Sequence, residues 1–464
     1  MDAAQTNTEV PSCPGCGERD RRIGQLETRI AVLEQKLEAA LRAGKRQAAP
    51  FSGGLPKVDP KRPGRRSGDD YGTKAFRVVP SVIDETHEAP LPESCPRCGG
   101  RQFIDEHVDH QYQVEIPRRP IYRQFNVAVA RCTCCGRRVQ GRHPLQTSDA
   151  LGCAASQIGP EAQSAITLLN KELGLSQGKI SRFLQALFGI KLTRGGSCQI
   201  MLRCARRCEG NYQAIVQRVQ QSPFLVPDET GWRIGGWLAW MHVAVAENAV
   251  AYVIARQRGL EASALLIGED YAGTLVHDGW ASYDRFWRAM HQTCLAHLLR
   301  RCKELLETAQ RGAVIFPRQV KALLRESLEI RDQRDAQTIT AKAAARKADD
   351  LQERMMTLVR PAKTHAANER FRRHLQRHGS QLFTFLRQEG IDATNHQAEQ
   401  AIRPAVVNRK VWGGNRTEAG AAAQSILMTV LFTASKLKRD GVQFLSQVLC
   451  SPKGHPPMLL PGTG

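Results

Sequence analysis

The chain has 464 residues, which is too long for a single hydrophobic core, so several domains are expected. Lysine and arginine outnumber aspartate and glutamate by 66 to 45, a net charge of +21, which indicates a polyanionic partner: nucleic acid first, a membrane surface second. No apolar run reaches the roughly 18–20 residues of a spanning helix and no signal peptide is visible, so we expect a cytoplasmic protein whose 14 cysteines are reduced or metal-bound.

Residues 20–43 carry an apolar repeat with alternating spacings of three and four, typical of a coiled-coil seam. We predict that residues 1–44 form a dimerising leucine zipper. The alternative is an amphipathic helix docked on its own domain. Cys13 and Cys16 have zinc-knuckle spacing but no second pair nearby. The seam positions are Ile23, Leu26, Ile30, Leu33, Leu37 and Ala40.

Residues 45–90 begin with a stretch rich in glycine, proline and basic side chains, which predicts a disordered linker. Such a linker could touch DNA phosphates or serve only as a solvated tether, and the two roles are compatible. Its basic residues include Lys57, Lys61, Arg62, Arg65, Arg66 and Lys74.

Residues 91–145 contain two C-x-x-C pairs, each followed by glycine, which predict a zinc ribbon. Alternating stretches at 111–116 and 124–130 suit two strands. The expected Zn²⁺ ligands are Cys95, Cys98, Cys132 and Cys135. Cys134 is then a spare thiol. The zinc would be structural, because four thiolates leave no open position on the ion.

Residues 146–222 are expected to form a helical region, in which residues 159–221 read as helices with a break at Gly174 and a second helix that begins at Ser176. This pattern is compatible with a helix-turn-helix that binds DNA, although any helical hairpin has a similar pattern. Cys204 and Cys208 share one helix face, and we interpret them as small packing residues.

Residues 223–440 have a different pattern, in which apolar strands are mixed with helices. The expected strands are 223–232, 237–246, 249–256 and 273–278, and the expected helices are 259–271 and one beginning at 281. A three-strand meander followed by a crossover helix and a further strand predicts a mixed α/β sheet with helices on its faces, in a multidomain α+β or α/β protein.

Asp228 lies on the first of these strands and Asp278 at the end of the fourth, which can pair beside the first. Carboxylates on adjacent strands suit hard divalent cations, and two such ions support phosphodiester chemistry. For either aspartate alone, a strand end or a turn is an equally ordinary explanation. Glu229 must point to the opposite side of the strand, so it is the poorer ligand.

A third acid, Glu399, begins a helical stretch in the C-terminal third of the chain. A basic cluster with an aromatic residue and glycines follows it, which suits a phosphate backbone and an unstacked base. The expected DNA-binding residues are Arg403, Arg409, Lys410, Trp412 and Arg416.

The chain resembles the insertion sequence sixty-six family of DDE transposases at four places. The matching positions are Asp228 to Thr230, Asp278 to Tyr283, Cys294 with His297, and the C-terminal run of Asn395, Glu399, Arg403, Pro404, Arg409, Lys410, Trp412, Gly420 and Ala421. One departure is Thr394-Asn395-His396, where the family often has Asp-Asn-Asn.

The resemblance implies a ribonuclease-H-like core in which Asp228, Asp278 and Glu399 are catalytic and hold two Mg²⁺ ions, or Mn²⁺. The reaction would be DNA end cleavage and strand transfer. His297 would orient a water or contact the scissile phosphate. Without the resemblance, Cys294 and His297 would be a packed cysteine and a hydrogen-bonded histidine.

The expected partners are transposon-end and target DNA, a second copy of the chain through the zipper, and accessory transposition proteins, in a bacterial, nucleoid-associated location without a membrane.

Residues 300–390 would be a helical insertion that shapes the DNA channel, or else a dimerising or solvated bundle. Residues 441–464 would be a tail. The rival readings are a non-catalytic zinc and zipper DNA-binding regulator, a related ribonuclease-H-like nuclease and an inactive copy.

Overall fold

The computed structural model describes residues 18, 22–30, 32–34, 78–104, 106–154, 157–452 and 454–460. The chain divides into two compact units, Met1–Pro117 and Arg118–Gly464. In the first unit, residues 22–30 and 32–34 are helical, and their four zipper positions are about half exposed. The pairing of two zippers stays a prediction. Several predicted features lie outside the described residues: Leu37, Ala40, Cys13, Cys16 and the basic side chains of the linker.

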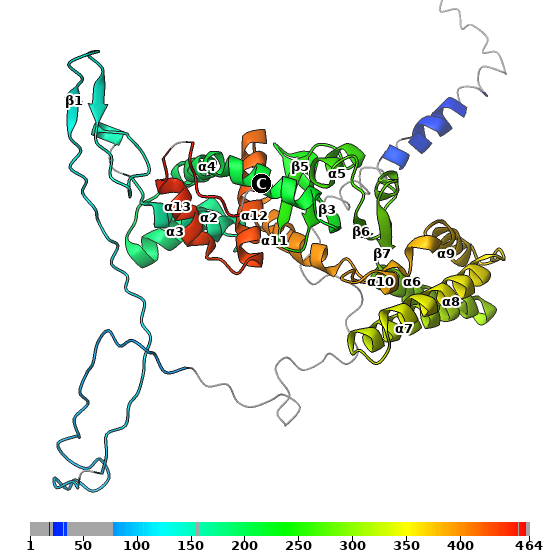
Figure 1. Ribbon diagram of the computed structural model, residues 1–464, viewed down its shortest axis with the longest axis horizontal. Coiled ribbons are helices and arrows are strands. Elements are labelled where there is room, and N and C mark those ends of the chain that lie inside the picture. The colour runs from blue at the N-terminus through cyan, green and yellow to red at the C-terminus, as the bar shows by residue number, and fades with distance from the viewer. Residues whose placement is uncertain are drawn as a thin grey trace, which may run out of the picture. The chain divides into compact units, whose positions relative to one another are not determined.

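The second unit is built on a five-stranded mixed sheet with the order β5-β4-β3-β6-β7 (Figure 1). Its strands are β3 (Phe224–Ile234), β4 (Trp237–Val245), β5 (Val250–Ala255), β6 (Thr274–His277) and β7 (Met290–Thr293). The first three form an antiparallel meander, and β6 and β7 pair in parallel on the other side of β3. This mixed sheet with its many helices confirms the expected α/β class and fits a ribonuclease-H-like core.

The predicted helix beginning at residue 281 is wrong. The chain forms only a 3-10 turn, Tyr283–Arg285, and then enters the fifth strand, β7. Tyr283 and Phe286 are buried, so the segment folds as a compact loop onto the core. Parallel pairing with buried β6 then outweighs the local helical pattern, because it satisfies the backbone groups of β7.

The two strands predicted near the cysteines are only partly right. Residues 111–116 are not a strand, and their apolar side chains are exposed, so nothing holds them extended against a partner. The short sheet instead pairs β1 (Val129–Arg131) with β2 (Arg138–Gln140) around the second cysteine pair. Only the end of the 124–130 stretch takes part.

The helices predicted within residues 159–221 are confirmed by α2 (Pro160–Lys171), α3 (Gln177–Phe188) and α4 (Arg194–Gln220). Gly174 adopts a positive φ of 72° in the break, and the Ser176 side chain caps α3 by accepting from Lys179 N–H. Cys204 and Cys208 are buried on α4, which supports their interpretation as packing residues.

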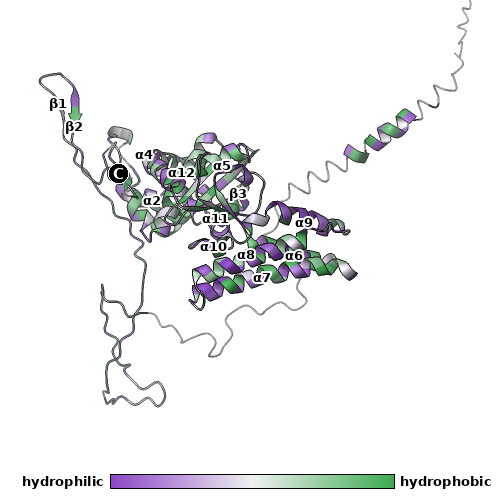
Figure 2. Ribbon diagram, turned by 45° about the vertical axis from the view of Figure 1, so that its right-hand side comes forward, coloured by the Kyte–Doolittle hydropathy of each residue, from purple (hydrophilic) through white to green (hydrophobic). Residues whose placement is uncertain are grey.

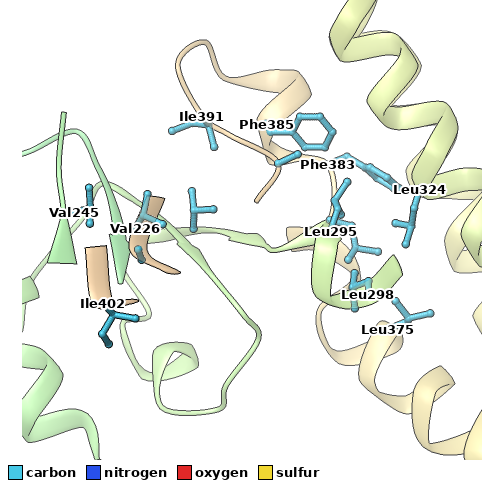
Figure 3. Packing of buried hydrophobic residues seen from close by; sticks show 14 of the residues in the cluster. Val226, Val245, Leu295, Leu298, Leu324, Leu375, Phe383, Phe385, Ile391 and Ile402 are labelled. Carbon is cyan, nitrogen blue, oxygen red and sulfur yellow. The ribbon is translucent and has the colours of Figure 1, made fainter. Parts of the chain in front are cut away.

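The stretch between the second and third acids is helical, as expected. It contains α6 (Leu295–Thr308), α7 (Ile315–Asp335), α8 (Ala341–Val359), α9 (Ala366–Arg377) and α10 (Thr384–Arg387). In Figure 2, α7, α8 and α9 show both hydrophilic and hydrophobic stretches, as amphipathic helices do. Figure 3 shows Leu295 and Leu298 of α6 near Leu324, Leu375 and Phe383, in the same hydrophobic cluster as Val226 of the sheet.

The remaining helices are α5 (Leu260–Ile267), α11 (His396–Trp412), α12 (Glu418–Lys436) and α13 (Gly441–Cys450). Residues 441–450, expected to open a tail, thus form a helix that buries Phe444, Leu445 and Val448 in the second hydrophobic cluster. In the part of the chain that the structure describes, no helix is long and apolar enough to cross a membrane.

Helix α12 covers the open edge of the sheet with three hydroxyls spaced one turn apart. Ser425, Thr429 and Thr433 accept hydrogen bonds from backbone N–H groups of β5, at 2.9 to 3.1 Å. These N–H groups face away from β4 and would otherwise be buried without partners. The spacing of four residues places all three hydroxyls on one helix face.

Replacing Thr429 by valine should destabilise the second unit, because the N–H of Tyr252 would remain buried without an acceptor. We expect a loss of about 1–3 kcal/mol in the free energy of unfolding, measured by chemical denaturation. Thr429→Ser should keep most of the stability. Thr308→Val is the matched control, since that exposed hydroxyl bonds only carbonyls of its own helix. Equal stability of Thr429→Val and wild type would contradict the edge-sealing role.

Candidate active site

The first two acids meet because β6 pairs in parallel beside β3. Phe224 lies opposite Thr274 and Leu225 opposite Leu275. The same offset carried three residues further places Asp278 level with Asp228 on the neighbouring strand. β6 ends at His277, so Asp278 opens the following turn, where its Oδ1 accepts the Trp280 N–H at 2.9 Å.

Asp228 sits in an electrostatically unfavourable place for a carboxylate. Burial and, to a smaller extent, the nearby charges of Glu229, Asp278 and Glu399 raise its pKa to about 7, although the hydrogen bond from the Glu229 N–H partly offsets them. The sequence-predicted triad is therefore brought into one neighbourhood, although Glu399 follows Asp278 by 121 positions in the chain. Like charges held close together favour a proton or a cation between them.

Glu229 is occupied by a structural network that the sequence did not reveal. Its side chain is only 3% exposed and pairs with Arg258 at 2.7 Å. The Tyr283 hydroxyl also donates to it at 2.7 Å. The Arg258 guanidinium lies between the rings of Trp240 and Trp280, 4.7 and 4.2 Å from their centroids. This carboxylate already has its partners, which leaves the preceding aspartate as the better ligand.

Glu399 lies in the first turn of α11, where it meets the first turn of α6. Its Oε1 is 3.5 Å from Nε2 of His297. The two helix starts are joined by a hydrogen bond from Leu295 N–H to the Ala393 carbonyl, 2.9 Å long. The Nδ1 atom of His297 is buried and has no hydrogen-bond partner among the described residues. His297 thus contacts the third acid, as a near-site role requires, whereas Cys294 is buried at the helix start.

The donor set fits a divalent metal by its chemistry. Three carboxylates supply the hard oxygen ligands that Mg²⁺ prefers, and a cation would relieve their mutual repulsion. Within the described ranges, however, no group of three or more His, Cys, Asp or Glu side chains is arranged to hold a metal ion. The acids share a neighbourhood without converging on one point.

A pair of histidines holds the turn that carries Asp278. Gly279 N–H donates to Nδ1 of His277 at 3.1 Å, so His277 carries its proton on Nε2 and donates it to Nδ1 of His291 at 3.0 Å. His291 in turn donates from Nε2 to the Phe286 carbonyl at 3.2 Å. Burial lowers the pKa of both rings, so this chain of neutral rings stays intact.

The predicted DNA-binding residues divide into two groups. Arg403, Lys410 and Arg416 are exposed. Arg409 instead donates to the Gly231 carbonyl of β3, and Trp412 packs edge-on against Trp232 at 5.7 Å. The second group therefore fastens α11 to the sheet.

Each cysteine pair forms a tight turn of the kind that suits a metal. Cys95 N–H donates to the Gly100 carbonyl and Gly99 N–H to the Cys95 carbonyl, with Gly99 at a φ of 75°. The second pair repeats the pattern around Cys132. Backbone N–H groups lower the pKa of Cys95 and Cys132, which favours thiolates. Whether both pairs share one ion stays a prediction.

Two comparisons with known proteins bear on this arrangement. No curated protein matches the chain. Residues 155–423, more than half of the sequence, match the family described as Transposase IS66 family. This range runs from the helical region before the sheet through all three acids and the start of α12. The chain therefore belongs to the IS66 family of transposases.

Proposed function

We propose that this protein is a DDE transposase that cuts the ends of its insertion sequence and joins them to target DNA. One observation carries the proposal. Asp228 on β3, Asp278 at the end of β6 and Glu399 at the start of α11 share one neighbourhood, where burial first, and then the charges of the neighbouring acids, raise the pKa of Asp228 to about 7. Membership of a transposase family supplies the substrate class, DNA.

In this proposal Asp228, Asp278 and Glu399 hold the metal, and their neighbours position them. Divalent cations bound there would activate the attacking oxygen and stabilise the leaving one. His297 contacts Glu399 and could pass a proton to or from the scissile phosphate group. Glu229 with Arg258 keeps the opposite side of β3 rigid, which limits how far Asp228 can shift.

The remaining regions would bind and pair DNA ends. We propose that the cysteine turns hold structural Zn²⁺, that α2 and α3 contact end sequences, and that the zipper pairs two chains. The exposed Arg403, Lys410 and Arg416 would contact phosphates near the acids. A non-catalytic DNA-binding regulator would have no use for the carboxylate cluster.

Glu399→Gln should abolish Mg²⁺-dependent cleavage of end DNA and strand transfer from pre-cut ends. Loss of a residue that supports a metal ligand costs about 10–100-fold, so loss of the ligand itself should cost more than about 100-fold. The assay is product formation on labelled end DNA. Glu389→Gln, an exposed glutamate before α11, is the control. Cleavage by Glu399→Gln at the wild-type rate would exclude this acid from the site.

Metal binding should compete with the proton on Asp228, whose pKa is raised to about 7. The apparent Mg²⁺ affinity should therefore rise from pH 6 towards pH 8 by up to about tenfold per unit and then level off. Asp228→Asn should lose both the trend and cleavage, whereas Glu229→Gln should keep the trend. Isothermal titration calorimetry at several pH values measures the apparent Mg²⁺ affinity of each variant.

The same shift predicts the pH dependence of the metal-free protein. The unfolded chain releases the Asp228 proton near its ordinary pKa of 3.8 and the folded chain only near 7. The preference of the folded chain for protonated Asp228 therefore stabilises the fold fully below pH 4, and this stabilisation is lost as the pH rises towards 7. In Asp228→Asn, the thermal unfolding temperature should lack this pH-dependent decrease. An unchanged pH profile in the variant would contradict the raised pKa.

Replacing Cys132 and Cys135 by serine should remove bound zinc, because serine hydroxyls are not deprotonated as thiolates are. Zinc content by atomic absorption should fall, and the thermal transition of the sheet domain should stay in place. Serine at Cys204 is the matched control, since that buried thiol contacts Thr167 rather than a metal. Full zinc content in the double variant would rule out the second cysteine pair as a ligand source.

A further inference from the structure

The hairpin between β3 and β4 presents a large aromatic side chain to solvent. Trp237, the first residue of β4, is 76% exposed. It follows Gly235 and Gly236, which adopt positive φ values of 61° and 86° and make the two-residue turn typical of right-twisted hairpins. At this exposure the ring contributes little to the core and is accessible to a ligand.

The hairpin tip is rigid. Gly235 N–H donates to the Asn415 carbonyl at 2.8 Å, and Asn415 N–H donates to the Arg233 carbonyl at 2.9 Å. The Arg233 guanidinium closes the turn on the Gly236 carbonyl at 2.8 Å. Gly414 must be glycine here, because a Cβ would lie 2.5 Å from the Arg233 carbonyl oxygen. The backbone that carries Trp237 is thus held in place, as a stacking platform requires.

The tip and the acids lie on the same face of the sheet. Asp228 pairs with Val243 and Ile234 with Trp237, and paired residues of antiparallel strands point to the same side. Six residues of β3 separate the two places, about 20 Å. That distance corresponds to about six stacked nucleotides.

Helix α11 connects the two places with unpaired positive charge. Its first turn carries Glu399, whose charge acts on Asp228, and its last turn packs Trp412 on Trp232 near the hairpin. Glu399, Arg403 and Lys410 lie within about 40° of one another around the helix axis.

The cations along this path are free to meet a polyanion. Arg403, Lys410 and Arg416 are exposed and form no ion pair with any side chain that the structure describes. The nearby acid Glu418 is already paired with Arg256. The charge along this path suits a phosphate backbone, and the aromatic at its end suits a base.

We propose that Trp237 stacks on an unpaired base of the DNA strand that runs along α11 from the carboxylate cluster. The inference rests on the proposed function and deepens it, because it assigns a contact for a frayed or flipped nucleotide at a distance from the scissile phosphate. Stacking tolerates any base, so this contact would sense melting of the DNA end rather than its sequence.

The test compares a blunt oligonucleotide duplex with the same duplex carrying a short unpaired fork. Binding is followed by fluorescence anisotropy with full-length Glu399→Gln protein, which leaves the DNA intact. Trp237→Ala should weaken binding of the forked DNA about 5- to 150-fold and leave the blunt duplex nearly unchanged. Trp237→Phe should restore most of the loss.

Trp287→Ala is the matched control. Trp287 is 78% exposed, but it precedes β7 at the end of the sheet away from Asp278. A 2-aminopurine base in the fork should be quenched by the parent protein and by Trp287→Ala, but not by Trp237→Ala.

Three outcomes would overturn the inference. If Trp237→Ala binds the fork as tightly as its parent while both bind duplex DNA, stacking is wrong and the proposed function stands. If the variant changes only the sedimentation coefficient, the tryptophan contacts a second copy of the chain. If the parent binds neither DNA, the proposed function fails as well.

Discussion

The parallel pairing of β6 with β3 is the constraint on which the candidate site depends. It sets Asp278 level with Asp228, and it ends one residue before Asp278 so that this side chain enters a turn. β3 continues past that level, paired with β4 and bridged to Asn415 at its end, and gives α11 a surface to pack on. The proximity of Asp228 and Asp278 follows from this strand register, and burial together with the neighbouring acids raises the pKa of Asp228 to about 7.

Helix α11 is both a core helix and the carrier of the third acid, Glu399. Ala398, Ile402 and Ala405 are buried in the cluster shared with β3 and β4, so the opposite face of the helix is left to solvent. A shift of this helix by one turn would separate Glu399 from Asp228 and remove Arg409 from the Gly231 carbonyl. Packing therefore fixes the third acid and the basic face together.

The surroundings of the acids consist of groups that already have partners. Glu229 is paired with Arg258 and Tyr283, and His277 and His291 complete a chain of neutral rings behind the turn of Asp278. Because these groups are satisfied by one another, they hold the backbone around Asp228 and Asp278 without competing for the same ligands.

The sequence by itself determined the features that depend on local pattern. Alternation predicted β3, β4 and β5, and Asp228 and Asp278 stood out by their places on the first and fourth expected strands. Glu399 stood out at the start of a helical stretch and through the family resemblance. The turns at the glycine-flanked cysteine pairs could also be predicted from the sequence, because the hydrogen bonds that close them join residues only a few positions apart.

Only the tertiary structure decided the rest. The segment after Asp278 became a 3-10 turn and a strand because burial of Tyr283 and Phe286 and pairing with β6 outweighed its helical pattern. Arg258 lies 29 positions from Glu229, and no local periodicity in the sequence predicts their contact. The physical reason is common to these cases: strand pairing and buried charge join residues distant in sequence, and their free energy is absent until the chain is folded.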